Sequence, residues 1–191
     1  MKSICRVNIS KEETKEIYDK LSNNYDSLAS GFEKKFKAVG VQLLNVQKGE
    51  SILEVGFGTG DVLVQLARLV GEKGNVAGID ISEGMVEVAT RRVNSFNLED
   101  RVRILRGDAL KMPFSKGEFD AIFASFFLEL IDTPEIPLIL NEFKRVLRKG
   151  GRVCLVDLAK GKKWNPLIWL YEGVHSLFPK MLDCRPIQPG T

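Results

Sequence analysis

The stretch Ile52-Leu-Glu-Val-Gly-Phe-Gly-Thr-Gly60 says more about the fold than any other part of this chain. A short apolar run ends in a turn with three glycines at alternate positions. Because glycine has no side chain, such a turn lets the backbone approach a ligand closely. Its amides suit an anion when the turn opens a helix. We therefore expect a strand, an anion-binding turn and a helix here, since three glycines exceed what packing a helix on a strand requires.

Strand and helix patterns alternate after this turn. We expect strands over residues 51–55, 75–79, 102–105, 119–124 and 152–158, and helices over 61–70, 82–95 and 133–147. Thr133-Pro134 is typical of a helix start, with the proline at the first helical position. The alternation predicts an α/β fold with a Rossmann-like, doubly wound, mostly parallel sheet. Ligands in such sheets bind beyond the carboxyl ends of the strands.

Two helices are expected before the sheet. Ser10-Lys-Glu-Glu13 is a capping box, which predicts a helix that begins there. After an interruption at Gly31, a second helix over about 32–44 has apolar residues at the helical period. These residues are Phe32, Phe36, Val39 and Leu43.

Composition sets limits on the class of protein. The chain has 191 residues, of which 44% are hydrophobic and 28% charged, with a formal net charge of +3. This charge is too small to indicate a nucleic-acid partner. The distant Cys5, Cys154 and Cys184 and the single His175 predict neither a disulfide framework nor a metal site. A polar N-terminus and the lack of a membrane-length apolar stretch predict a cytoplasmic protein.

One domain is expected over residues 1–191. Its parts are N-terminal helices over 10–45, a cofactor-binding core over 46–160 and a C-terminal segment over 161–191.

The residue after the glycine turn limits the choice of cofactor. Asp61 stands where a phosphate-binding Walker loop needs lysine and where a dinucleotide fingerprint needs its last glycine. Asp80, at the end of the second strand, can accept both hydroxyls of a ribose. An alternative is that Asp80 only supports the dipole of the next helix.

Two further acids separate an adenosyl cofactor from a nicotinamide. Glu54, before the first glycine, would repel a pyrophosphate but would suit an ammonium group. Asp108, in Gly-Asp-Ala after the third strand, can accept an exocyclic amine such as that of adenine. A ligand that carries an ammonium, a carboxylate, a ribose and an adenine is S-adenosylmethionine.

Several motifs resemble those of the class I S-adenosylmethionine-dependent methyltransferases. Ile52 to Gly60 looks like the first motif of that family, and Val76 to Met85 is similar to its second-strand motif. Gly107 to Ala109, with the strand that follows, and Leu147 to Asp157 match the later motifs. Tyr18 to Asp26 and Pro113-Phe114 resemble the ubiquinone/menaquinone biosynthesis methyltransferase group.

The resemblance implies roles for individual residues. The methionine end would be held by Glu54 and the turn amides of Gly56, Gly58 and Gly60, with Tyr18 and Tyr25 near the cofactor. Asp80 would hold the ribose, Ile81 and Met85 would enclose the adenine, and Asp108 and Ala109 would contact its edge. Ser125 and Phe126 would face the methyl group.

The sequence does not identify a catalytic base. A sulfonium donor is already activated, so positioning and desolvation can supply most of the catalysis, and no metal is needed. Acids near the fourth and fifth strands and one histidine are candidates, each more simply structural: Glu129, Asp132, Asp157 and His175. We expect Glu129 to face solvent or a helix end.

An aromatic-rich helix is expected over 164–178. It either packs on the sheet or covers a hydrophobic, lipid-like acceptor. The sixth and seventh strands that close the sheet in this family are predicted to be missing. The exposed edge of the fifth strand would then be covered by this helix or by a second copy of the chain in a homodimer.

Methyl transfer to a small acceptor is therefore the leading hypothesis. The alternatives are a cofactor-binding, non-catalytic subunit and a nicotinamide-dependent oxidoreductase. Titration with S-adenosylhomocysteine and with NAD would separate the last of these from the other two.

Overall fold

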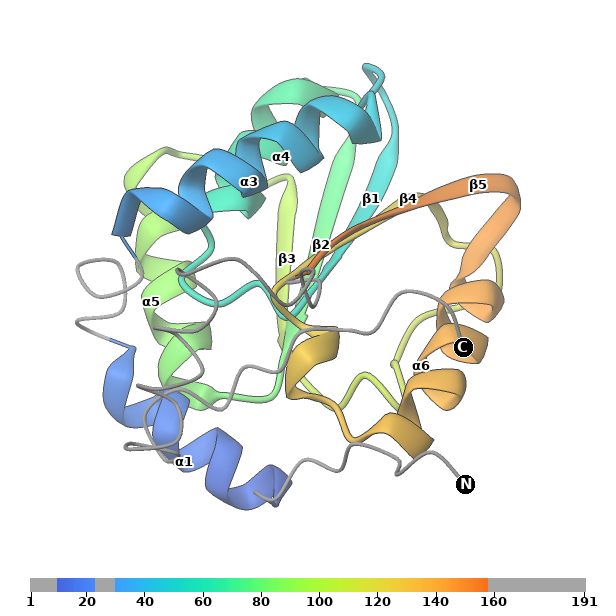
Figure 1. Cartoon of the computed structure of the whole chain (residues 1–191). Coiled ribbons are helices and arrows are strands. Elements are labelled where there is room, and N and C mark those ends of the chain that lie inside the picture. The colour runs from blue at the N-terminus through green and yellow to red at the C-terminus, as the bar shows by residue number, and fades with distance from the viewer. Residues whose placement is uncertain (1–9, 23–29, 158–191) are drawn as a thin grey trace, which may run out of the picture.

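The computed structural model describes residues 10–22 and 30–157 (Figure 1). Five parallel strands form one sheet in the order β3-β2-β1-β4-β5. Their bounds are Ser51–Val55 (β1), Asn75–Asp80 (β2), Val102–Arg106 (β3), Phe119–Ser125 (β4) and Leu147–Val156 (β5).

Helices cover both faces of this sheet. α3 (Ser30–Leu44), α4 (Asp61–Val70) and α5 (Glu83–Ser95) lie on one face, and α6 (Ile136–Val146) lies on the other (Figure 1). α1 (Lys11–Leu21) packs beside α5, and two short 3-10 turns, η1 (Leu128–Leu130) and η2 (Thr133–Glu135), follow β4. The predicted doubly wound α/β fold is confirmed.

The central strands have buried side chains on both faces. On β1, Ile52 packs into the cluster beneath α4 and α5, whereas Leu53 and Val55 pack into the cluster beneath α6. All seven residues of β4 are buried. Because successive side chains of a strand point to opposite faces, a near-continuous apolar run is what a doubly covered parallel strand requires.

The order of strands places a switch point beside β1. From β1 the chain winds outward through β2 to β3, then returns to β4 on the other side of β1. The carboxyl ends of β1 and β4 therefore diverge at the centre of the sheet, where ligands bind in such folds.

The predicted helix α3 does not bury the face that carries its large apolar residues at the helical period. Phe36, Val39 and Leu43 are 42%, 45% and 75% exposed, whereas Val41 and Leu44 are buried. Gly40 is the reason: a Cβ built on it would meet the side chains of Val156 and Phe123. The helix approaches β4 and β5 through this small residue, so its larger apolar side chains turn outward. Residues 30–32 are helical and include Gly31, which was expected to precede the helix.

The junction between α6 and β5 also differs from the prediction. α6 ends at Val146, and Leu147 already pairs with Phe119, so the strand begins five residues earlier than expected. The register then shifts, and Ala121 pairs with Arg152. The Lys149-Gly150-Gly151 segment, with Gly150 at φ +80°, forms this irregularity within the strand instead of ending the helix.

The segment predicted as the start of α6 is a 3-10 turn and not the first turn of the α-helix. Thr133 and Pro134 lie inside the 3-10 turn η2, whose N-cap is Asp132, and α6 starts only at Ile136. The predicted capping box is confirmed, because the Ser10 side chain accepts from the Glu13 amide and the Glu13 carboxylate accepts from the Ser10 amide.

Several predictions concern residues outside the described ranges. They are the aromatic helix over 164–178, the missing closing strands, and the positions of Tyr25 and His175. Within the described residues, β5 pairs with β4 alone and forms one edge of the sheet.

Replacing Gly40 with alanine should destabilise the protein. In a free helix, glycine to alanine is worth roughly 0.5–1 kcal/mol of stabilisation. The added methyl group would press on Phe123 Cε2 at 3.0 Å and on Val156, and overpacking of this kind costs about 1–3 kcal/mol. Urea unfolding of Gly40→Ala should therefore show a lower free energy of unfolding.

Two further variants test this cause. Val156→Ala in the same chain should remove part of the cost, and exposed Ala38→Gly measures the helix propensity of α3 without the clash. A Gly40→Ala variant more stable than the unsubstituted protein would contradict the close approach of α3.

Candidate active site

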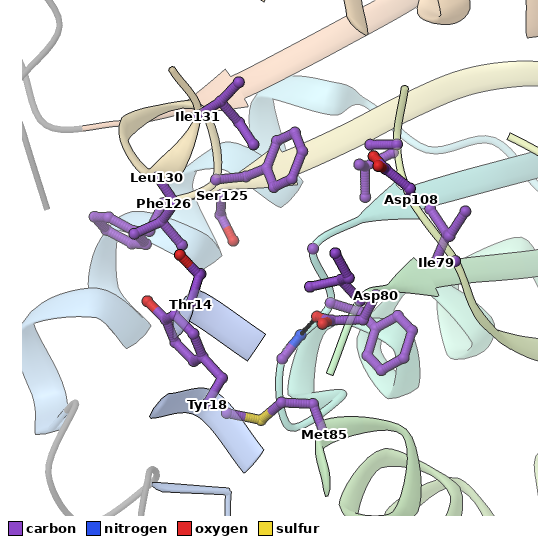
Figure 2. A pocket seen from close by; sticks show the side chains of 18 of the residues that line it. Thr14, Tyr18, Ile79, Asp80, Met85, Asp108, Ser125, Phe126, Leu130 and Ile131 are labelled. Carbon is purple, nitrogen blue, oxygen red and sulfur yellow. Dashed lines mark hydrogen bonds between the residues drawn. The ribbon is translucent and has the colours of Figure 1, made fainter. Parts of the chain in front are cut away.

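A cavity lies beyond the carboxyl ends of β1, β2, β3 and β4. It collects nine of the predicted site residues, which are Tyr18, Gly56, Gly58, Asp80, Ile81, Met85, Asp108, Ala109 and Ser125. Figure 2 shows Thr14 and Tyr18 on one side of this space, and Ile79, Asp80 and Asp108 across from them. The strand-end residues thus face one another although they are far apart in the sequence.

The glycine turn has the backbone shape that only glycine adopts without strain. Gly56, Gly58 and Gly60 have φ values of +70°, +54° and +77°. A Cβ on Gly58 would project into open space, which leaves its backbone accessible on the side of the cavity. A Cβ on Gly60 would instead meet Ala89 Cβ at 2.8 Å, so this glycine lets α4 pack against α5.

Asp80 links the turn to the second strand. One carboxylate oxygen accepts from the Gly58 amide at 2.9 Å (Figure 2). The other accepts from the Ser82 amide at 3.0 Å. Burial raises the pKa of Asp80 to about 6, with the charge of Asp19 acting in the same direction, although three backbone amides favour the ionised form. The carboxylate keeps lone pairs beyond these two bonds and can accept from further donors.

Asp108, after β3, is held by its own loop and by α1. Its Oδ1 accepts from the Leu110 amide at 2.9 Å, and its Oδ2 lies 3.1 Å from Lys11 Nζ. The same ammonium lies 3.2 Å from Glu135. Lys11 thereby joins the start of α1 to Asp108 after β3 and to Glu135 in η2.

The other end of α1 is fastened to the start of α5. Asp19 Oδ1 accepts from the Ser82 hydroxyl at 2.6 Å and from the Gly84 amide at 3.0 Å. Burial acts to raise the pKa of Asp19, but hydrogen bonds from Lys15, Ser82 and Gly84 hold it at about 2. These contacts position Thr14 and Tyr18 on the cavity wall.

Two predicted residues lie beside the cavity and do not line it. Gly60 is the N-cap of α4, and Glu54 is 1% exposed on β1. Desolvation raises the pKa of Glu54 well above its usual value, and the charge of Asp61 adds to this effect. Among the described residues, nothing donates a hydrogen bond to Glu54 Oε2. Tyr25 lies outside the described ranges.

The acids considered as bases have structural positions. Asp157 Oδ1 accepts from the amides of Phe127 and Leu128, both at 3.2 Å, and so caps η1. Glu129 was expected to face solvent or a helix end, and the first alternative is wrong, because the residue is 3% exposed. The cause is η1, which turns this residue inward just after β4. Asp132 is the N-cap of η2.

One wall of the cavity is apolar. Phe126, at φ +51°, follows Ser125, and Phe127, Leu130 and Ile131 continue the wall (Figure 2). Sequence reasoning missed the last three residues, because no motif marks a 3-10 turn that folds back on the cavity. It also missed Lys11, Thr14, Glu33 and Lys37 from α1 and α3. The only sequence signal for these four residues was the spacing of polar residues along each helix. That spacing does not show which part of the fold the polar side packs against.

Comparison with known proteins identifies the family. A family model described as the ubiE/COQ5 methyltransferase family matches residues 6–180. The chain belongs to this family. The resemblance to the ubiquinone/menaquinone methyltransferase group, and with it the methyltransferase class, is therefore confirmed.

Individual members of the ubiE/COQ5 methyltransferase family are similar over most of the chain. A demethylmenaquinone methyltransferase of Lactobacillus johnsonii is 33% identical over 165 residues, which cover 85% of this chain and 64% of that protein. One from Staphylococcus epidermidis is 32% identical over 176 residues, covering 90% of this chain and 69% of the relative. The chain thus spans about two thirds of the length of these relatives.

Solved structures agree with the fold. A methyltransferase from Aquifex aeolicus, described as SAM dependent, has a TM-score of 0.60 at 27% identity, covering 76% of this chain and 78% of its own. A geranyl diphosphate C-methyltransferase from Streptomyces coelicolor has a TM-score of 0.64 at 22% identity, covering 84% and 61%, and shows the fold alone. In the part of the chain that the structure describes, no helix is long and apolar enough to cross a membrane.

Asp80 and Asp19, which both contact Ser82, should make the free energy of unfolding depend on pH with opposite signs. The pKa of Asp80 is raised to about 6 in the folded state, so its contribution to stability falls as pH rises from about 4 to 6. The pKa of Asp19 is lowered to about 2, so its contribution is present above about pH 4 and is lost as pH falls towards 2.

Urea unfolding at several pH values measures both effects. Relative to the unsubstituted protein, Asp80→Asn should gain up to about 3 kcal/mol between pH 4 and pH 7. Asp19→Asn should lose stability relative to it as pH rises from 2 to 4. The same sign of pH dependence in both variants would contradict the assigned environments.

Proposed function

We propose that this chain transfers a methyl group from S-adenosylmethionine to a quinone-like lipid. The observation that carries the proposal is a single cavity that joins the acids after β2 and β3 to the apolar wall after β4, in a member of the ubiE/COQ5 methyltransferase family. The polar part suits a nucleoside, and the apolar wall suits a hydrophobic ring.

The residues that line the polar part fit the cofactor. Asp80 has acceptor capacity for the ribose hydroxyls, and Asp108, beside Ala109, for an exocyclic amine. Ile81 and the buried Met85 supply apolar surface for the adenine. Gly58 leaves open the space that a side chain would fill. The other site roles inferred from the resemblance are retained as proposals, including those of Tyr18 and Tyr25. The amides of Gly56 and Gly60 donate to the carbonyl oxygens of Ile79 and Phe57, so these two glycines contribute the shape of the turn and not free donors.

When bound, S-adenosylmethionine supplies a methyl group on a positively charged sulfur, which needs no further activation. The chain contributes orientation and the exclusion of water. Ser125 lies at the end of β4, between the polar part and the apolar wall that holds Leu130 and Ile131. A general base is needed only if the acceptor must lose a proton. Asp157 is not assigned this role, because its Oδ1 is used to cap η1.

Other competing functions lack support. Membership of a methyltransferase family favours neither a nicotinamide-dependent oxidoreductase nor a non-catalytic subunit. We further propose that residues 1–191 form one domain, that the protein is cytoplasmic, and that it forms a homodimer through the β5 edge or the C-terminal segment. Among the described residues, the outer side of β5 pairs with no strand. This supports the dimer, because the unpaired backbone groups of an edge strand can pair with a strand of a second chain.

Measuring methyl transfer to different classes of acceptor tests the proposed substrate. The purified chain is incubated with methyl-labelled S-adenosylmethionine and, separately, with a demethylated prenyl naphthoquinone, a prenyl phenol and a small amine. The proposal expects label in a prenylated ring and none in the amine. Binding of S-adenosylhomocysteine without label transfer to any ring would favour the non-catalytic subunit instead.

Asp80→Ala should weaken S-adenosylhomocysteine binding. Losing hydrogen bonds from the ribose to a charged acceptor costs about 1–3 kcal/mol, which is roughly 5- to 150-fold in the dissociation constant. Isothermal titration calorimetry measures this change. Asp100→Ala is the matched control, because this exposed acid lies in the loop before β3, away from the cavity. Equal affinities of both variants would overturn the ribose assignment.

A further inference from the structure

Two cations line the cavity among the described residues, and they lie at different places. Lys11 is engaged by Asp108 and Glu135 beside the end of β3. Lys37, on α3, lies beside the start of α4, directly after the glycine turn, because its ammonium is 3.8 Å from Asp61 Oδ1. The second cation therefore lies near the amides that were expected to hold a carboxylate.

Lys37 is enclosed but loosely held. Its side chain is 14% exposed, and its ammonium lies 3.4 Å from Glu33 Oε2 and 3.8 Å from Asp61 Oδ1. Both separations exceed the usual range for a charged hydrogen bond. An enclosed ammonium loses much of its hydration, and well-formed hydrogen bonds must compensate for this loss. These two long contacts leave room for a closer partner of the Lys37 ammonium.

The surroundings of Lys37 contain more acids than bases. Glu33 and Asp61 face it directly, and Glu54, which is 1% exposed, is influenced by its charge. Among the described residues, neither Glu54 Oε2 nor Asp61 Oδ1 accepts a hydrogen bond. Such a set of groups matches a ligand that carries a cation and an anion close together.

We propose that Lys37 binds the carboxylate of the methionine moiety of the cofactor, an inference that rests on the proposed function. The start of α4 attracts a carboxylate through its free amides, but Asp61 at the first helical position repels it. Lys37 lies close enough to Asp61 to offset that repulsion. When the carboxylate takes the ammonium of Lys37, the acids around it become available to the neighbouring ammonium of the ligand.

This change of partner, from the protein acids to the ligand carboxylate, would make Lys37 a residue that determines ligand specificity. It would favour ligands that carry the full amino acid over ligands that end in an amine or a methyl group. A purely structural role, in which Lys37 ties α3 to α4, would affect all adenosyl ligands alike. The two roles therefore differ in their dependence on the ligand.

Calorimetry with three ligands separates these roles. The ligands are S-adenosylhomocysteine, its decarboxylated analogue and 5′-methylthioadenosine, which lacks both charges of the amino acid. In Lys37→Met, affinity for S-adenosylhomocysteine should fall about 10- to 100-fold, as expected for a lost charge-assisted hydrogen bond. Affinity for the other two ligands should change less than about threefold. Lys37→Arg should retain most of the preference, since it keeps the charge.

Lys34→Met is the matched control, because Lys34 is exposed on the same helix and does not line the cavity. It should leave all three affinities unchanged. Unchanged binding of S-adenosylhomocysteine by Lys37→Met would overturn the inference, as would an equal loss for all three ligands.

The unsubstituted protein provides a test that does not depend on how the variant folds. It must bind S-adenosylhomocysteine more tightly than the decarboxylated analogue, and equal affinities would overturn the role of Lys37 alone. Failure of the unsubstituted protein to bind any of the three ligands would overturn the proposed function and this inference with it.

Discussion

The hydrogen bond from the Gly58 amide to Asp80 joins the two parts on which the site depends. The turn after β1 has glycines at three alternate positions with positive φ, and Asp80 at the end of β2 accepts from the amide of the middle one at 2.9 Å. Since β1 and β2 are adjacent and parallel, both ends meet at the same edge of the sheet. The same carboxylate contacts the start of α5 through Ser82. Asp80 at the end of β2 thereby holds the glycine turn and the start of α5 in place.

Three acids near the carboxyl ends of β1, β2 and β5 cost the fold stability when they are ionised. Burial raises the pKa values of Glu54, Asp80 and Asp157, which means that the fold loses stability to keep these acids ionised. Lys11, on α1, offsets the charge of two other acids, Asp108 and Glu135. A bound molecule with positive charge and several hydrogen-bond donors would offset more. This is consistent with a sulfonium cofactor.

Helices and strands with a strong apolar period and clear end residues could be predicted from the sequence. The contacts between these elements could not. α4 was expected over 61–70 and is found there, because Gly60 and Gly71 bound an amphipathic run. α3 was expected in nearly the right place, but its apolar period does not mark its buried face, because the helix contacts β4 and β5 through Gly40. Glu129 was misplaced for a similar reason, since a 3-10 turn has no apolar period to read.

The order of motifs alone specified the α/β class, the cofactor type and most residues at the strand ends, because these positions follow from where each parallel strand stops. The local sequence contains no information about which helix reaches back over those ends. Folding brings Lys11, Thr14 and Tyr18 from α1, and Lys37 from α3, to the cavity. Their positions depend on contacts between residues far apart in the chain, such as Asp19 with Ser82 and Gly40 with Val156. Such contacts arise from packing and charge in three dimensions, which no spacing along the sequence records.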